Sequence, residues 1–192
     1  MRVDVFDFDG TIYDGDSTVD YLLYCLGKKP FLVLFCLPPL FRALFKKLFG
    51  NFSLTEFKSD LFSVFAQCFS LSEMAEKFWS REKTKAKIGI WFKEREHSLP
   101  IVIASASPDF ELIPAARYLC ADVLICTRCD PLTGRLIGKN CKNTEKIKRI
   151  QEVFGDYQVH AMYTDDQKAD GPLLSIAEEK YLVKHGVVNK IS

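Results

Sequence analysis

The sequence predicts an α/β fold: a mostly parallel sheet with a helical domain inserted after its first strand. Short apolar runs alternate with helical patterns along much of the chain, as in parallel βαβ units. Residues 16–97 show helical signals but no strand pattern. The 192 residues suffice for one core and an insertion. We therefore predict a core of residues 1–15 and 98–192 and a helical cap of residues 16–97.

The first strand ends in two carboxylates that are one residue apart. The run VDVFDFDGT, from Val3 to Thr11, passes from strand formers into a turn. Side chains alternate along an extended chain, so Asp7 and Asp9 leave on the same side, about 6–7 Å apart. Such a pair needs a cation or a proton between its members, and Mg²⁺ prefers carboxylate and phosphate oxygens. One carboxylate can attack phosphorus and the other can carry the leaving-group proton, although a lone pair of this kind is more often a solvated turn.

The insertion opens with a helix capped by Asp16 or Ser17 and ended by Gly27. Its apolar residues recur at helical spacing: Val19, Leu22, Leu23 and Leu26. Two capping boxes, Ser53–Glu56 and Ser70–Glu73, each begin a further amphipathic helix. These signals predict a helical bundle.

The most apolar part of the chain, Phe31 to Phe49, lies inside this insertion. Its stretch from Phe31 to Leu44 is too short to span a bilayer, and Pro38 and Pro39 are expected to break it. No acidic residue lies between Lys28 and Gly50, where the basic residues are Lys28, Lys29, Arg42, Lys46 and Lys47. Residues 28–50 therefore suit a membrane headgroup region, but an apolar stripe packed inside the bundle explains them equally well.

Polar residues also follow the next strands. Pro100–Ser105 has the pattern of a central parallel strand, after which Ser107 is expected as a helix N-cap with Pro108 at the first helical position. Such a helix start favours an anion. Residues 121–126 predict another strand, and residues 130–137 predict a hairpin excursion.

The C-terminal part predicts a helix from Asn143 to Gly155 with Lys146 in its first turn. Lysine is unfavourable there unless a phosphate and a carboxylate compensate it. Val159–Thr164 predicts a strand that ends in an acidic cluster, Asp165, Asp166 and Asp170, before a helix at Gly171-Pro172. Tyr181–Val183 is expected as the last strand. Because ligands bind beyond the carboxyl ends of parallel strands, these residues together predict a phosphate site.

In this order the motifs resemble those of the haloacid dehalogenase (HAD) superfamily over the whole chain. FDFDGT at 6–11 resembles the first motif and IASASP at 103–108 the second. Lys146 resembles the third motif and YTDDQKAD at 163–170 the fourth. The resemblance implies a Rossmann-like core with an all-helical C1 cap. SASP resembles subfamily IB, the phosphoserine-phosphatase-like branch.

The resemblance also implies a role for each matched residue. Asp7 would form an aspartyl-phosphate, and Asp9 would act as general acid and then as base. The expected phosphate-binding and loop-steadying residues are Thr11, Ser105, Ala106 and Lys146. Mg²⁺ would be held by Asp7, the Asp9 carbonyl, Asp170 and either Asp165 or Asp166. Tyr-Thr-Asp resembles the Tyr-Ser-Asp of this branch, which favours Asp165.

The expected function is Mg²⁺-dependent hydrolysis of a phosphomonoester. Residues 31–49 resemble the cap of the bacterial phosphatidylglycerophosphate phosphatase, so a lipid-linked phosphate is one substrate class. The alternatives are a phosphatase of a soluble metabolite such as phosphoserine, a phosphotransferase, and a non-catalytic module that binds a membrane or a protein.

Composition limits the partners and the compartment. A net charge of +1 without basic and aromatic repeats argues against a nucleic-acid groove. Seven irregularly spaced cysteines and no signal-peptide pattern predict a cytoplasmic protein, at the membrane surface if residues 28–50 contact lipid. Cys126, Cys129 and Cys141 lack the second ligand pair of a zinc site, so we expect them to be small core residues.

Overall fold

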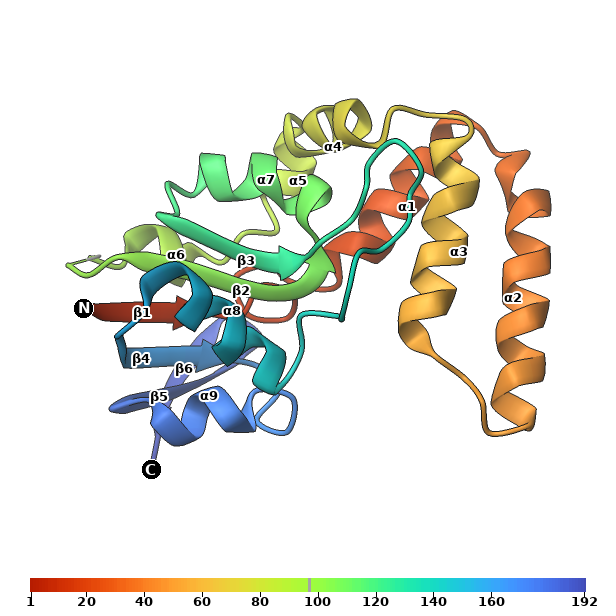
Figure 1. Cartoon of the computed structure of the whole chain (residues 1–192). Helices are drawn as coiled ribbons and strands as arrows, with labels where there is room; N and C mark the ends of the chain where they lie inside the picture. Colours follow the sequence, from red (N-terminus) through yellow and green to blue (C-terminus); the bar gives the residue numbers. More distant parts are fainter. Residues whose placement is uncertain (97) are drawn as a thin grey trace.

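The computed structural model describes residues 1–96 and 98–192, so His97, the last residue of the predicted cap, lies outside the described residues (Figure 1). Within them the sheet has six strands in the order β3-β2-β1-β4-β5-β6. The strands are β1 (Arg2–Phe6), β2 (Ile101–Pro108), β3 (Val123–Thr127), β4 (Gln158–Thr164), β5 (Glu179–Lys184) and β6 (Val187–Ile191). The first five pair in parallel, which confirms the predicted α/β class.

Helices cover both faces of this sheet. In chain order they are α1 (Ser17–Lys28), α2 (Leu32–Leu48), α3 (Leu54–Ala66), α4 (Leu71–Trp79), α5 (Glu82–Lys85), α6 (Ile90–Glu94), α7 (Asp109–Tyr118), α8 (Thr144–Phe154) and α9 (Gly171–Ile176). Val3 and Val5 of β1 pack with Ile150 of α8, whereas Phe6 packs in the cluster that holds Phe110 of α7. Alternation along β1 therefore separates two apolar layers.

The prediction that the sheet ends at Tyr181–Val183 is wrong. β5 turns back through His185 and Gly186, both at positive φ, and β6 pairs with it antiparallel. Val187 is 59% exposed at this edge of the sheet. An exposed edge strand needs no continuous apolar run, so the sequence VVNKI gave little strand signal.

Two paired linkers join the insertion to the core. Tyr13 and Ile88 form an antiparallel bridge, and hydrogen bonds of 2.8 Å join Asp14 N to Lys87 O and Gly89 N to Ile12 O. Helix α6 follows the returning linker, and the rings of Phe92 and Phe6 pack edge to face at 5.1 Å. We therefore propose that the cap ends near residue 87 and that α6 belongs to the core.

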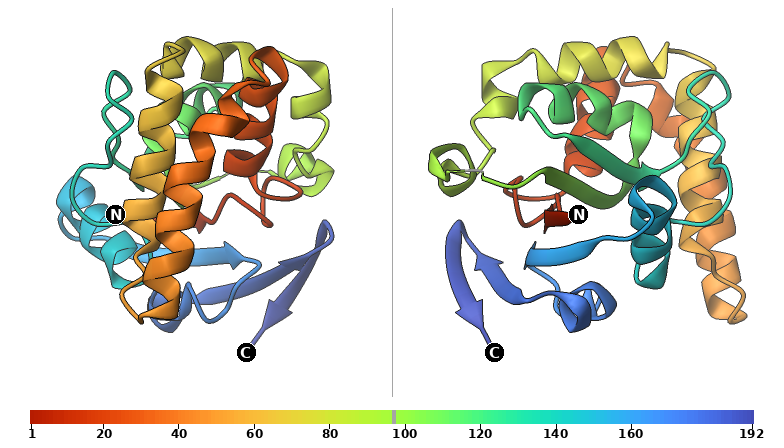
Figure 2. Two further views of the ribbon diagram at one scale, coloured as in Figure 1. Left: turned by 90° about the vertical axis from the view of Figure 1, so that its right-hand side faces the viewer. Right: turned by 60° about the vertical axis from the view of Figure 1, so that its left-hand side comes forward.

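Helix α2 continues through Pro38 and Pro39, so the predicted break is wrong. Each proline removes one backbone N–H, but the residues whose carbonyls lose a partner, Leu34 and Phe35, are 66% and 57% exposed and accessible to water. The α2–α3 hairpin stands beyond the carboxyl ends of the core strands and crosses in front of the sheet in the left view of Figure 2. No described helix combines the length and apolar character needed to cross a membrane.

The apolar side chains of α2 are not packed inside the bundle. Of the side chains described in α2, Leu32 alone is buried. We call the exposed large apolar residues here the α2 surface: Phe31, Val33, Leu34, Phe35, Leu37, Leu40, Phe41, Leu44, Phe45, Leu48 and Phe49. The structure thus excludes the alternative that these side chains fill the interior of the cap.

The three cysteines considered as zinc ligands are core residues. Cys126 and Cys129 belong to the apolar cluster that contains Phe6, and Cys141 belongs to the one that contains Val5. This placement confirms the expectation that they act as small core side chains.

Candidate active site

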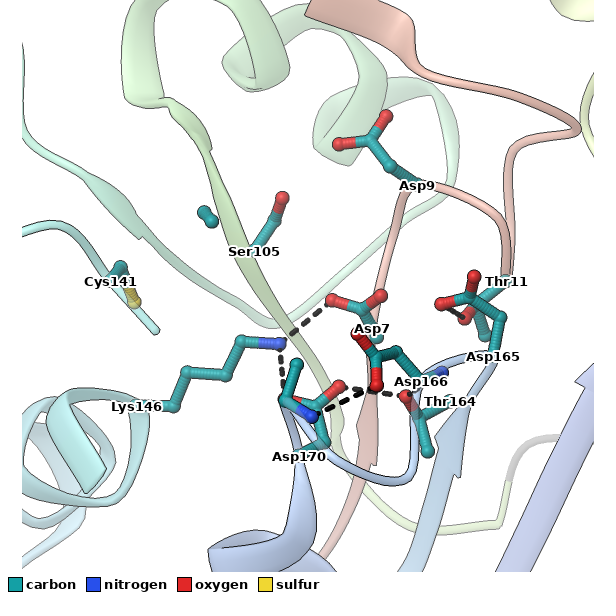
Figure 3. A network of polar contacts seen from close by, with 12 residues as sticks. Asp7, Asp9, Thr11, Ser105, Cys141, Lys146, Thr164, Asp165, Asp166 and Asp170 are labelled. Carbon is teal, nitrogen blue, oxygen red and sulfur yellow. Dashed lines mark hydrogen bonds and ion pairs between the residues drawn. The ribbon is translucent and has the colours of Figure 1, made fainter. Parts of the chain in front are cut away.

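The carboxyl ends of β1 and β4 meet the first turn of α8 (Figure 3). Asp7 follows β1, and its backbone N–H donates to the carbonyl of Tyr163 in β4 at 2.9 Å. Asp170 is the N-cap residue of α9, and Lys146 lies in the first turn of α8. Residues from three distant parts of the chain are thus brought together.

Lys146 forms the centre of this cluster. Its Nζ lies 2.7 Å from Asp7 Oδ1 and 2.7 Å from Asp170 Oδ1. Burial raises the pKa of Asp7 to about 7, although the Lys146 charge acts to lower it. Burial also acts to lower the pKa of Lys146, but the two carboxylates overcome this and hold it above its usual range. Carboxylates therefore lie beside Lys146 as expected, whereas the phosphate expected with them stays a prediction.

Thr164, which was not among the predicted site residues, fixes the second carboxylate of the cluster. Its Oγ1 donates to Asp170 Oδ2 at 2.7 Å and accepts the backbone N–H of Asp166 at 3.0 Å. The sequence signal for this role was a threonine at the end of a predicted strand, directly before acidic residues.

Asp9 lies apart from Lys146 in Figure 3. Its Oδ1 accepts the backbone N–H of Ser17 at 2.6 Å, and its Oδ2 accepts the Ser107 hydroxyl at 2.5 Å. Burial raises the Asp9 pKa, against these hydrogen bonds. The prediction of Ser107 as an N-cap is wrong, because β2 continues to Pro108, which is itself the N-cap residue of α7.

Hydrogen bonds also hold the rest of the second motif. Ser105 is buried, and its Oγ accepts the backbone N–H of Ser107 at 3.0 Å. The Ala106 carbonyl accepts the Thr127 hydroxyl at 2.9 Å. The segment from Ser105 to Ser107, which is expected to bind phosphate, is therefore held by a hydrogen bond within itself and by another from β3.

The two alternative acids of the fourth motif have different surroundings. Asp165 Oδ1 lies 3.5 Å from Thr11 Oγ1, and a Cβ at Gly10 would lie 2.3 Å from Asp165 Oδ2. The Asp166 carboxylate accepts two backbone N–H groups of its own turn at 2.9 and 3.0 Å. Across residues 1–96 and 98–192, no three His, Cys, Asp or Glu side chains are gathered at metal-binding distances. The metal roles of Asp7, Asp9, Asp165, Asp166 and Asp170 therefore all stay predictions.

Comparison with known proteins identifies the family. The family model for haloacid dehalogenase-like hydrolases matches residues 5–175. Protein CicA of Caulobacter vibrioides is 35% identical over 184 residues, which cover 91% of this chain and 82% of CicA.

Solved structures share the fold. A protein of unknown function from Bordetella pertussis Tohama I has a TM-score of 0.71 and 19% identity over 93% of this chain and 88% of its own. A probable phosphoserine phosphatase from Vibrio cholerae has a TM-score of 0.61 and 12% identity over 94% of this chain and 55% of its own. With four motifs in order and a family model that spans most of its length, the chain belongs to the haloacid dehalogenase-like hydrolase family.

Proposed function

We propose that this protein is a Mg²⁺-dependent phosphomonoester hydrolase that acts through an aspartyl-phosphate on Asp7. The observation that carries the proposal is the buried contact of Lys146 with both Asp7 and Asp170, at 2.7 Å each, beyond the carboxyl ends of parallel strands. Such a place combines a nucleophile with a fixed positive charge for a phosphate.

The donor set fits a hard divalent cation. Asp7 and Asp170 offer carboxylate oxygens, Asp9 offers a backbone carbonyl, and Asp165, or else Asp166, is the third acid. The raised pKa of Asp7 supports this fit, because it indicates that Lys146 does not fully compensate the buried charge. When bound, Mg²⁺ would supply positive charge that neutralises these acids and the phosphate.

Each of the site's side chains then has its own role in the reaction. Lys146 engages Asp7 Oδ1, so Oδ2 is the oxygen that attacks phosphorus while the bond to the leaving oxygen breaks. Asp9 gives its proton to the leaving oxygen and later takes one from the water that attacks the phospho-aspartate. This second step releases phosphate and restores both acids. The Ser105 hydroxyl is proposed to donate to a phosphoryl oxygen.

Hydrolysis of p-nitrophenyl phosphate tests the reaction. We expect Mg²⁺-dependent hydrolysis that EDTA abolishes and that Asp7→Asn reduces to the background rate, because an amide is a poor nucleophile. Asp156→Asn, at an exposed turn, is the matched control and should keep wild-type activity. Absence of hydrolysis from a full screen of soluble and lipid phosphomonoesters would instead favour the non-catalytic module.

The exposed α2 surface supports a lipid-linked substrate such as phosphatidylglycerophosphate, bound at the cytoplasmic face of a membrane. Large exposed apolar patches mark interaction sites, and this one includes Phe41 and Phe45 at 64% and 62% exposure. Lys28 and Lys47 have no acidic partner within the described chain, whereas Arg42 and Lys46 pair with acids of α3. Free basic residues beside apolar ones suit an anionic lipid surface.

Vesicle binding tests the lipid proposal separately from catalysis. Phe41→Ser/Phe45→Ser should lose flotation with phosphatidylglycerol vesicles, and its activity on vesicle-bound phosphatidylglycerophosphate should fall relative to p-nitrophenyl phosphate. Leu132→Ser removes an apolar residue that is even more exposed, at 85%, and lies far from α2 in sequence, so it should change neither measurement. No flotation of the wild-type protein would contradict the lipid proposal and leave a soluble metabolite such as phosphoserine.

A further inference from the structure

A basic hollow lies in the cap between helices α1, α4 and α5. We call it the α1–α4 hollow; its volume is about 930 Å³, and none of its lining residues is a predicted catalytic or metal-binding residue. Its charged lining consists of five basic side chains and one acidic side chain: Lys28, Lys77, Arg81, Lys83, Lys87 and Asp20. Because the whole chain has a net charge of only +1, the hollow concentrates positive charge locally.

The acid of the hollow balances only one of these basic side chains. Asp20 Oδ2 accepts hydrogen bonds from Lys87 Nζ at 2.5 Å and from the Tyr13 hydroxyl at 2.6 Å. The other four basic side chains of the lining form no ion pair within the described chain. The hollow therefore keeps an unbalanced positive charge.

Acidic residues do lie on the same helices, but they pair elsewhere. Glu76 of α4 pairs with Arg117 of α7 at 3.0 Å, and Glu82 of α5 pairs with Lys85 at 3.2 Å. Neither glutamate lines the hollow. Charges of both signs are commonly interspersed on a protein surface, whereas here the basic ones are gathered on one face.

The ends of the helices do not account for this charge. Lys28 and Lys77 lie in the last turns of α1 and α4, where a lysine is favourable. A helix C-terminus carries only about half a negative charge, so two such ends balance about one of the four unpaired cations. An anion that enters the hollow relieves the repulsion among the rest.

An aromatic ring and an apolar side chain lie among the basic residues. The guanidinium carbon of Arg81 lies 4.7 Å from the centre of the Tyr24 ring, and Lys28 Nζ lies 5.4 Å from the same centre. Leu23, which also lines the hollow, is 58% exposed. A guanidinium held in this way can bind two phosphate oxygens at once, and Leu23 and Tyr24 offer contacts for an organic group that carries the phosphate.

We propose that the α1–α4 hollow binds a phosphate-bearing organic anion, which is either the headgroup of an acidic phospholipid or a soluble organic phosphate. The inference goes beyond the proposed function, because the hollow lies outside the catalytic cluster and binds its anion whether or not the protein hydrolyses phosphomonoesters. Lys28 precedes Phe31 of the α2 surface by three residues, so a lipid headgroup in the hollow adjoins the surface that is proposed to contact lipid.

Removing two cations tests the hollow. Arg81→Gln/Lys83→Gln should weaken binding to phosphatidylglycerol vesicles, measured by flotation, about tenfold or more, because each basic residue near an acidic membrane adds to binding. Arg2→Gln/Lys148→Gln removes the same two charges from the core and should bind as wild type does. Should the first double variant not fold, Lys77→Gln, at an exposed position of α4, weakens the same site and decides instead.

Dissolved glycerophosphoglycerol distinguishes the two sources of phosphate. It is the phosphatidylglycerol headgroup without acyl chains, and as a diester it is not a substrate of the proposed reaction. If the hollow takes soluble phosphates, NMR titration in the presence of EDTA should shift the backbone amides of residues 80–84 in wild type but not in Arg81→Gln/Lys83→Gln. Weaker vesicle binding without these shifts assigns the hollow to lipid headgroups.

The inference is overturned if Arg81→Gln/Lys83→Gln and Arg2→Gln/Lys148→Gln behave alike with both probes. A wild-type protein that hydrolyses no phosphomonoester but binds either probe through the hollow would refute the proposed function and leave this inference standing.

Discussion

Individual residues show how the site manages its buried charges. Asp7 and Asp9 are one residue apart, yet Asp7 contacts the buried Lys146 whereas Asp9 is held by Ser17 N and Ser107. Each buried ion costs several kcal/mol to desolvate, and burial raises the pKa of both acids although their different partners act to lower it. The different partners of Asp7 and Asp9 fit their proposed roles as nucleophile and as acid and base.

Replacing Lys146 should strongly destabilise the protein. Lys146→Met leaves two buried acids without a cation, and breaking such a pair costs about 3–5 kcal/mol. Urea unfolding in the absence of Mg²⁺ measures the loss. Lys148→Met, on the exposed side of the same helix, should change the free energy of unfolding by less than about 0.5 kcal/mol. Equal effects of the two substitutions would contradict the electrostatic argument.

Glu111 should make stability depend on pH. Burial raises its pKa to about 8, from 4.5 in an exposed chain, so the folded state holds this proton more tightly than the unfolded state. Stability from this group is therefore complete below about pH 4.5 and is lost as pH rises to about 8, by up to about 1.4 kcal/mol per unit.

The matching measurement compares urea unfolding at pH 5.5 and pH 7.5 in wild type and Glu111→Gln. We expect the variant to lose less stability than wild type over this interval, because glutamine does not ionise. Glu152→Gln, on the exposed side of α8, is the control and should follow wild type. A parallel pH dependence in all three proteins would show that Glu111 is not protonated in this range.

Similar local patterns led to different helices. Two capping boxes were predicted, and both helices begin where expected. Ser53 Oγ accepts the Glu56 N–H at 3.3 Å, whereas Ser70 accepts no such bond from the described residues.

The apolar stripe predicted for α1 is only partly right. Val19 and Leu23 are exposed while Tyr21 and Cys25 are buried, and the helix runs past Gly27 to Lys28. Packing against neighbouring elements selects the buried face.

The two serines make a matched pair of substitutions. Ser53→Ala removes a side-chain cap and should lower the free energy of unfolding by about 1 kcal/mol. Ser70→Ala removes no cap bond, so its effect should be clearly smaller. Thermal unfolding followed by circular dichroism gives both values. A larger loss for Ser70→Ala would mean that its hydroxyl caps α4 in solution.

In the whole molecule, the core and part of the cap share one apolar cluster, and the α2–α3 hairpin projects from them. One apolar cluster runs from the sheet into the cap, where Trp79 of α4 packs edge to face on Phe8 and Tyr13 at 5.8 and 5.6 Å. Helix α2, in contrast, packs mainly on α3 and leaves the α2 surface exposed. We therefore expect the core, α1 and α4 to unfold together.

The two tryptophans allow this cooperativity to be measured. Trp91→Phe leaves Trp79 as a probe of the cap, and Trp79→Phe leaves Trp91, which stacks on Tyr163 of the core at 5.7 Å. In each variant, the fluorescence transition in urea should coincide with that of far-UV circular dichroism. A cap probe that changes at distinctly lower urea than circular dichroism would show that the cap unfolds on its own.

The sequence by itself determined the α/β class, the helical insertion and the residues of the four motifs. Their signals are local runs and spacings, and parallel strands necessarily bring their carboxyl ends to one edge of the sheet. It did not reveal β6, whose exposed edge carries little apolar pattern.

Only the tertiary structure decided which partner each acid has and that the α2 surface is exposed. It also brought Thr164 to Asp170 and connected Asp9 to Glu111 through Thr18 and Ser107. The physical reason is that most of these contacts join side chains distant in sequence. Their direction and burial depend on how the cap and the core pack, which no local pattern encodes.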